Sequence, residues 1–194
     1  MTPVIKKSLL TFSFLLPLFL NGQDFDAVIA EMAVEHEAEI IELRHWFHQN
    51  AELSNREFKT AEKISEALIK IGLEPKTGIA KTGVVAVLKG GKPGPVVALR
   101  ADIDGLPVKE RADLPWKSNM VGEYNGEKVP VMHACGHDTH TAMLLGVAKI
   151  LYTIKDDIPG SIKFIFQPAE EGAPAGEEGG AELMVKEGVL KNPE

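Results

Sequence analysis

The sequence predicts an α/β fold in which helices pack on both faces of a mixed β-sheet. Helical and extended segments alternate along the chain, which is the pattern of this fold class. The extended segments are short, nearly continuous apolar runs, as expected of strands that are covered on both faces. The composition, with 44% hydrophobic and 25% charged residues, is that of an ordinary globular protein.

Apolar residues recur at helical spacing in four segments. They predict helices at about 26–50, 58–71, 139–154 and 181–187. Gly72 directly follows the second segment, where a glycine favours the end of a helix. The predicted buried stripe of the third helix consists of Met143, Leu144, Val147, Ile150 and Leu151.

Three apolar runs rich in β-branched residues predict strands at 83–88, 95–100 and 160–166. The first two flank a turn at 89–94 that contains three glycines and a proline. Residues 105–130 are polar and interrupted by prolines, so a loop is predicted there. About three strands are fewer than such a sheet usually has. We therefore expect the N-terminal part of a longer domain rather than a complete small one.

Residues 1–23 have the layout of a secretory signal peptide. Lys6 and Lys7 precede an apolar run at 8–20, and a short polar exit follows. The run is short and contains Pro17, which disfavours a membrane anchor. We expect cleavage, export to the periplasm or the extracellular space, and a mature domain at 24–194 that does not associate with the membrane.

The chain is acidic, with 21 Lys and Arg against 28 Asp and Glu. An acidic protein without a cluster of cations is not expected to bind nucleic acid, because that binding requires neutralisation of phosphates. The single cysteine excludes an internal disulfide. In an exported protein, a free thiol is expected to be buried or bound to something.

The segment 132–140 concentrates one cysteine, three histidines and one aspartate in nine residues. Cys135 and His137 flank Gly136, which lets the backbone turn tightly so that both side chains reach one point. Thiolate and imidazole are suitable zinc ligands. The start of the following helix is expected to favour the thiolate. Asp138 is expected to cap that helix or to support the site, and His140 to contact the substrate or to pack.

Two further acidic motifs follow predicted strands, where the sites of open α/β sheets lie. Glu170 and Glu171 come after the strand at 160–166. Because adjacent side chains project differently, one can bind a metal while the other takes a proton from an activated water. Asp102 and Asp104 follow the strand at 95–100 and are placed to orient a metal-binding histidine.

Together these motifs resemble the dinuclear metallopeptidases that include hippurate hydrolases, auxin-conjugate hydrolases and N-acyl-amino-acid amidohydrolases. The resemblance covers residues 37–194. Its motifs are at 43–54, 99–107, 132–140, 167–172 and 179–190. It implies a zinc-peptidase-like catalytic domain in which Cys135, His137 and Glu171 bind two metal ions and Glu170 is the general base. Two further metal histidines, and a lid domain through which a homodimer would form, are expected beyond residue 194.

The resemblance implies metal-dependent hydrolysis of the amide bond of N-acyl or N-aroyl amino acids or small peptide-like conjugates. Mn²⁺ or Zn²⁺ is expected first, while Co²⁺ or Ni²⁺ also suits a cysteine, histidine and carboxylate shell. Two alternatives remain: an amidase with Cys135 as the nucleophile, and a truncated metal-binding homologue without turnover. The 194-residue segment alone is expected to be inactive.

Overall fold

The computed structural model describes residues 25–191, so the predicted signal peptide at 1–23 lies outside the described residues. Within this range no helix combines the length and the apolar character that crossing a membrane requires. The helices are α1 (Phe25–Gln49), α2 (Phe58–Ile71), α3 (His137–Thr153) and α4 (Gly180–Lys186). The strands are β1 (Lys76–Ile79), β2 (Gly83–Lys89), β3 (Lys92–Asp102), β4 (Met120–Tyr124), β5 (Glu127–Val131) and β6 (Pro159–Gln167).

The main sheet is mixed and has the strand order β1-β2-β6-β3. The strand β6 pairs with β2 in antiparallel orientation and with β3 in parallel orientation. The two strands that flank the glycine-rich turn therefore do not pair with each other, because β6 lies between them. In the parallel pair, Asp102 lies opposite Gln167, so β3 and β6 end together at one edge of the sheet.

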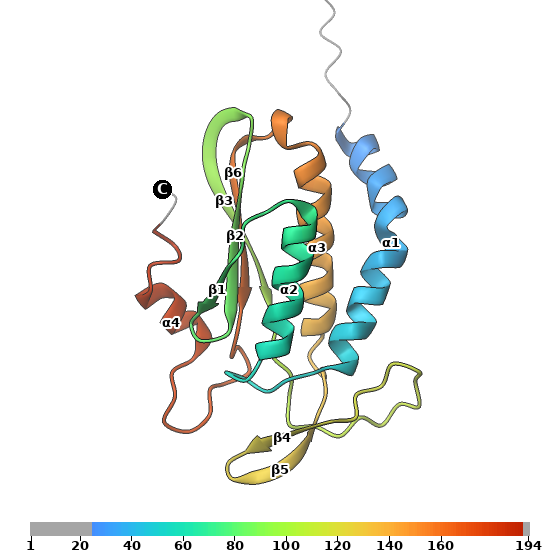
Figure 1. The fold of residues 1–194 in the computed structure, drawn as a ribbon, viewed down its shortest axis with the longest axis vertical. Coiled ribbons are helices and arrows are strands. Elements are labelled where there is room, and N and C mark those ends of the chain that lie inside the picture. Colours follow the sequence, from blue (N-terminus) through green and yellow to red (C-terminus); the bar gives the residue numbers. More distant parts are fainter. Residues whose placement is uncertain (1–24, 192–194) are drawn as a thin grey trace, which may run out of the picture.

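Helices cover both faces of this sheet, which confirms the predicted fold class (Figure 1). On one face α2 and α3 pack on the strands, and α1 covers α3. The core between them contains Phe47, Ile64, Leu68, Leu145, Phe164 and Phe166. On the opposite face Met184 of α4 packs in a smaller cluster with Val85 and Ile165.

The buried face of α3 differs from the predicted stripe. Met143 and Val147 are exposed, whereas Leu145 and Ala148 are buried. The reason is the close approach of α1, since a Cβ at Gly146 would lie 3.0 Å from the side chain of Ile40.

The segment 105–130 is not only a loop, because it contains the hairpin β4–β5. Asn125 and Gly126 both have positive φ, 53° and 83°, as the central residues of a tight two-residue hairpin turn require. The short strand β1 was also not predicted. The expectation that the strands are covered on both faces is wrong for β3, which lies at the sheet edge and is largely exposed.

Candidate metal centre

Three side chains from two distant motifs converge at the carboxyl edge of the sheet. His137 is the first residue of α3, Cys135 lies two residues before it, and Glu171 lies in the loop after β6. One ligand atom of each, a sulfur, a ring nitrogen and a carboxylate oxygen, lies within 4.8 Å of the others. The structure thus brings together the three residues that the sequence analysis assigned to metal binding.

The backbone turn at Gly136 produces this convergence. Gly136 has φ 93°, a left-handed conformation that a glycine adopts without strain. The helix α3 begins directly after it, at His137, so the expectation that Asp138 caps a later helix start is wrong. Asp138 instead lies inside the first turn. Its Oδ2 accepts a hydrogen bond from His48 Nδ1 at 2.8 Å and forms an ion pair with Arg44 Nε at 3.0 Å, which ties α3 to α1.

Asp104 connects the two motifs. Its carboxylate accepts hydrogen bonds from the hydroxyl of Ser54 at 2.7 Å and from the backbone N–H of Glu171 at 3.0 Å. His137 Nδ1 lies 3.2 Å from Asp104 Oδ1 and 3.0 Å from its carbonyl oxygen. These contacts occupy Nδ1, which leaves Nε2 to face the site. Asp104 is thus placed as expected of a residue that orients a metal-binding histidine.

The electrostatics of this contact are strong because both partners are buried. Burial lowers the pKa of His137, but the hydrogen bond and charge of Asp104 outweigh it and raise this pKa to about 9. Burial alone would raise the pKa of Asp104, but hydrogen bonds from His137 and Ser54 hold it below its usual value.

The donor set fits a divalent metal. Oε1 of Glu171 is buried and has no hydrogen-bond partner among the described residues, which leaves a carboxylate oxygen for a cation. Interaction with Glu171 raises the pKa of the Cys135 thiol. The protein alone therefore favours the neutral thiol, and the expectation that the start of the helix favours the thiolate is wrong. A cation among these groups reverses this effect, since positive charge favours the thiolate. Sulfur, imidazole and carboxylate together suit zinc and related ions.

Glu170 and Glu171 point differently, as their adjacent positions predict. The side chain of Glu170 is 38% exposed, against 19% for Glu171. Oε2 of Glu170 lies 3.6 Å from His137 Nε2, so this carboxylate borders the site while it remains accessible to water.

The other predicted residues lie around this group rather than in it. The carboxylate of Asp102 forms an ion pair with Arg100, with 2.8 Å between Oδ1 and Nε. The backbone N–H of Asp102 donates a hydrogen bond to His140 Nδ1 at 3.4 Å. The ring of His140 lies 6.4 Å from the ring of His137 and is partly exposed. His133 is buried and is not one of the three donors, and burial lowers its pKa to about 4.

Glu57 is a buried acid that the sequence analysis missed. It is fully buried, and its carboxylate accepts hydrogen bonds from the backbone N–H of Ala169 at 2.8 Å and the hydroxyl of Thr82 at 2.6 Å. Ala169 has φ 47°, so Glu57 holds an unusual turn directly before Glu170. A glutamate just before a helix is typically a solvent-exposed residue, and no pattern in the sequence indicated its burial.

Glu57→Gln is expected to stabilise the protein at high pH. Burial raises the pKa of Glu57 to about 7, above the usual 4.5, so the folded state favours the protonated form. The stability from this group is fully present below pH 4.5 and is lost as pH rises through 7. Glutamine does not ionise and so avoids this loss, which raises the free energy of unfolding at pH 8 by up to about 3 kcal/mol relative to wild type.

The measurement is the free energy of unfolding at pH 5 and pH 8, with a chelator present. Glu62→Gln, at an exposed position of α2, is the control, and its difference from wild type should be the same at both pH values. A difference between Glu57→Gln and wild type that is equal at both pH values contradicts the burial argument.

An α/β sheet with sulfur, nitrogen and oxygen donors at its carboxyl edge has the arrangement of a metal-dependent α/β hydrolase domain. A family model described as peptidase family M20/M25/M40 matches residues 98–194, which is half of the chain. The chain belongs to this family.

Individual relatives agree with this assignment. The chain is 49% identical over 152 residues to thermostable carboxypeptidase 2 of Saccharolobus solfataricus, covering 78% of this chain and 36% of the relative. It is 45% identical to an N-acyl-L-amino acid amidohydrolase of Geobacillus stearothermophilus, covering 84% of this chain and 40% of the relative. The chain therefore spans about two fifths of the length of these relatives.

A solved structure shares the fold. The YXEP protein of Bacillus subtilis, described as a dinuclear metal-binding peptidase of the M20 family, matches with a TM-score of 0.68 and 38% identity. The match covers 86% of this chain and 41% of that one.

Proposed function

We propose that this protein is a metal-dependent amidohydrolase that cleaves the amide bond of N-acyl or N-aroyl amino acids or small peptide-like conjugates. The observation that carries the proposal is the convergence of Cys135, His137 and Glu171 within 4.8 Å, with the carboxylate of Glu170 beside them. The similarity to an N-acyl-L-amino acid amidohydrolase supports the substrate class.

In this proposal Cys135, His137 and Glu171 hold two divalent ions, Mn²⁺ or Zn²⁺ first, and Co²⁺ or Ni²⁺ as further candidates. When bound, such ions make water more acidic and polarise the amide carbonyl. The description of a related structure as dinuclear supports the number of ions. Asp104 orients His137, Asp138 fixes the start of α3 on α1, and Asp102 and His140 border the substrate.

Glu170 is the proposed general base. Its carboxylate takes a proton from the attacking water and then delivers this proton to the nitrogen of the leaving amino acid. The carboxylate of Glu170 suits this role because it is partly exposed to water and its Oε2 lies 3.6 Å from His137 Nε2.

The experiment compares a chelator with a cysteine-alkylating reagent on the complete gene product, since residues 1–194 alone are expected to be inactive, with N-benzoylglycine as substrate. A chelator is expected to abolish hydrolysis, and Mn²⁺ or Zn²⁺ to restore it. A cysteine-nucleophile amidase, the alternative, would keep its activity in the chelator and lose it on alkylation of Cys135. Hydrolysis that persists after complete metal removal contradicts the proposal.

The location and the assembly are parts of the same proposal. We propose that residues 1–23 direct export to the periplasm or extracellular space and are then removed. The expected partners are the small N-acyl substrate and a second copy of the protein, bound through a lid domain outside residues 1–194.

A further inference from the structure

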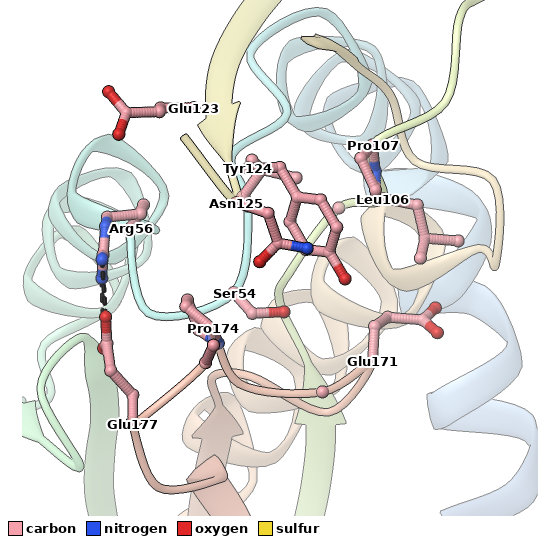
Figure 2. Close-up of a pocket in the computed structure, with 14 residues that line it drawn as sticks. Ser54, Arg56, Leu106, Pro107, Glu123, Tyr124, Asn125, Glu171, Pro174 and Glu177 are labelled. Atoms are coloured by element: carbon pink, nitrogen blue, oxygen red, sulfur yellow. Dashed lines mark hydrogen bonds and ion pairs between the residues drawn. The ribbon is translucent and has the colours of Figure 1, made fainter. Parts of the chain in front are cut away.

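A pocket of about 320 Å³ lies beside Glu171 and has no role in the assignments above (Figure 2). Its walls come from residues 53–56, from 105–107 after β3, from the tip of the hairpin β4–β5, and from the loop 172–177. This volume is in the range of a site for a small molecule or part of one. Because Glu171 is one wall, whatever fills the pocket lies next to the metal-type donors.

The hairpin tip is a firmly held wall. The strands β4 and β5 pair over all five residues, and the tight turn at Asn125 and Gly126 closes them. A Cβ at Gly122 would lie 2.8 Å from Leu53, so the hairpin lies directly on the segment before α2. Figure 2 shows the side chains of Tyr124 and Asn125 reaching from this tip into the space above Ser54, with Glu171 beyond.

The charges around the pocket disfavour an anionic occupant. The cation among its described lining residues is Arg56, whose guanidinium binds Glu177 through contacts of 2.6 and 3.2 Å. Glu177 also pairs with Lys81, and hydrogen bonds from Arg56 and Lys81 lower its pKa to about 2. The lining carboxylate of Glu123 adds negative charge, while the carboxylate of Glu171 is the one assigned to the metal ions. A substrate carboxylate in this pocket would meet no unpaired cation among these residues.

The remaining surface suits an uncharged, flat group. Leu106, Pro107 and Pro174 supply apolar walls, and the ring of Tyr124 supplies an aromatic face. The hydroxyl of Tyr124 and the amide of Asn125 are neutral hydrogen-bonding groups. An aromatic ring gains from contact with another ring beyond the burial of its area.

We propose that this pocket receives the uncharged acyl side of the substrate, with a preference for an aromatic acyl group, and that Tyr124 and Asn125 determine this specificity. The inference rests on the proposed function. The charge of Glu123 and the engagement of Arg56 by Glu177 also favour an orientation in which the free carboxylate of the amino acid lies outside this pocket.

The test measures binding separately from turnover. Metal-loaded Glu170→Gln protein is titrated calorimetrically with N-benzoylglycine and with N-acetylglycine. Adding Tyr124→Ala is expected to raise the Kd of the benzoyl ligand about tenfold and that of the acetyl ligand less than about twofold. Lys128→Ala, in the same hairpin but outside the pocket, is the matched control and should change neither Kd.

In a second variant, Asn125→Lys is expected to strengthen the binding of N-succinylglycine relative to N-acetylglycine.

Two outcomes overturn the inference. If Tyr124→Ala weakens both ligands by the same factor or neither, the acyl group does not lie against this hairpin, while hydrolysis by the wild type leaves the proposed function intact. If the full-length, wild-type, metal-loaded protein hydrolyses neither ligand, the proposed function fails and the assignment of the subsite fails with it.

Discussion

Glu170→Gln is expected to lower kcat for N-benzoylglycine by about 10²–10⁴-fold, the usual contribution of a general acid–base group. Glutamine has almost the same shape as glutamate but does not accept the proton of the attacking water. Because Glu170 is not one of the three converging donors, the variant should retain its metal. The measurements are the kinetics of hydrolysis and the metal content of the same preparation.

Glu178→Gln is the matched control for this variant. Glu178 lies in the same loop and pairs with Lys186 at the surface, away from the three donors. The Glu178→Gln protein is expected to hydrolyse N-benzoylglycine at the wild-type rate. A fully active Glu170→Gln protein would assign the proton transfer to another residue.

Asp104→Ala is expected to lower metal affinity by about 10- to 100-fold and to destabilise the fold by about 3–5 kcal/mol. The substitution leaves the ring of His137, the hydroxyl of Ser54 and the backbone N–H of Glu171 without their shared acceptor. The backbone N–H of Glu171 then loses its acceptor, and Nδ1 of His137 keeps only one of its two, the carbonyl oxygen of residue 104. Metal titration and chemical unfolding measure the two effects.

Asp104→Asn separates the two effects. Its oxygen can still accept the hydrogen bonds of Ser54 and Glu171, so most of the stability should remain, whereas its amide group faces His137 and should still weaken metal binding. Asp113→Ala, at an exposed position paired with Lys117, is expected to change neither quantity. Wild-type metal affinity in both Asp104 variants would show that this carboxylate does not support the centre.

The three metal-type donors were predictable because their chemistry is concentrated in short motifs. A cysteine and a histidine around a glycine, followed by a helix, constrain the local backbone strongly, and the observed φ of 93° at Gly136 agrees. The rule that the sites of open α/β sheets lie beyond the carboxyl ends of strands predicted a carboxylate from Glu170 or Glu171 at the centre, whereas the choice of Glu171 as the ligand rested on the family resemblance. Local signals therefore sufficed for most of the centre.

The supporting residues were not predictable because their roles arise only from packing. Glu57 is separated by 112 positions from the backbone N–H that it holds, and its residue type gives no sign of burial. The hairpin β4–β5 contains Gly122 and Pro130 and lacks a clear alternation of apolar residues, so the segment has the composition of a loop. The buried face of α3 depended on the approach of α1 at Gly146.

Anomalous diffraction from crystals of the native gene product, recorded at the absorption edge of the bound metal, tests the central claim most directly. We expect peaks at bonding distance, about 2.0–2.3 Å, from Cys135 Sγ, His137 Nε2 and a carboxylate oxygen of Glu171. Crystals grown with Mn²⁺ or Zn²⁺ that show no peak beside these three atoms would contradict the account.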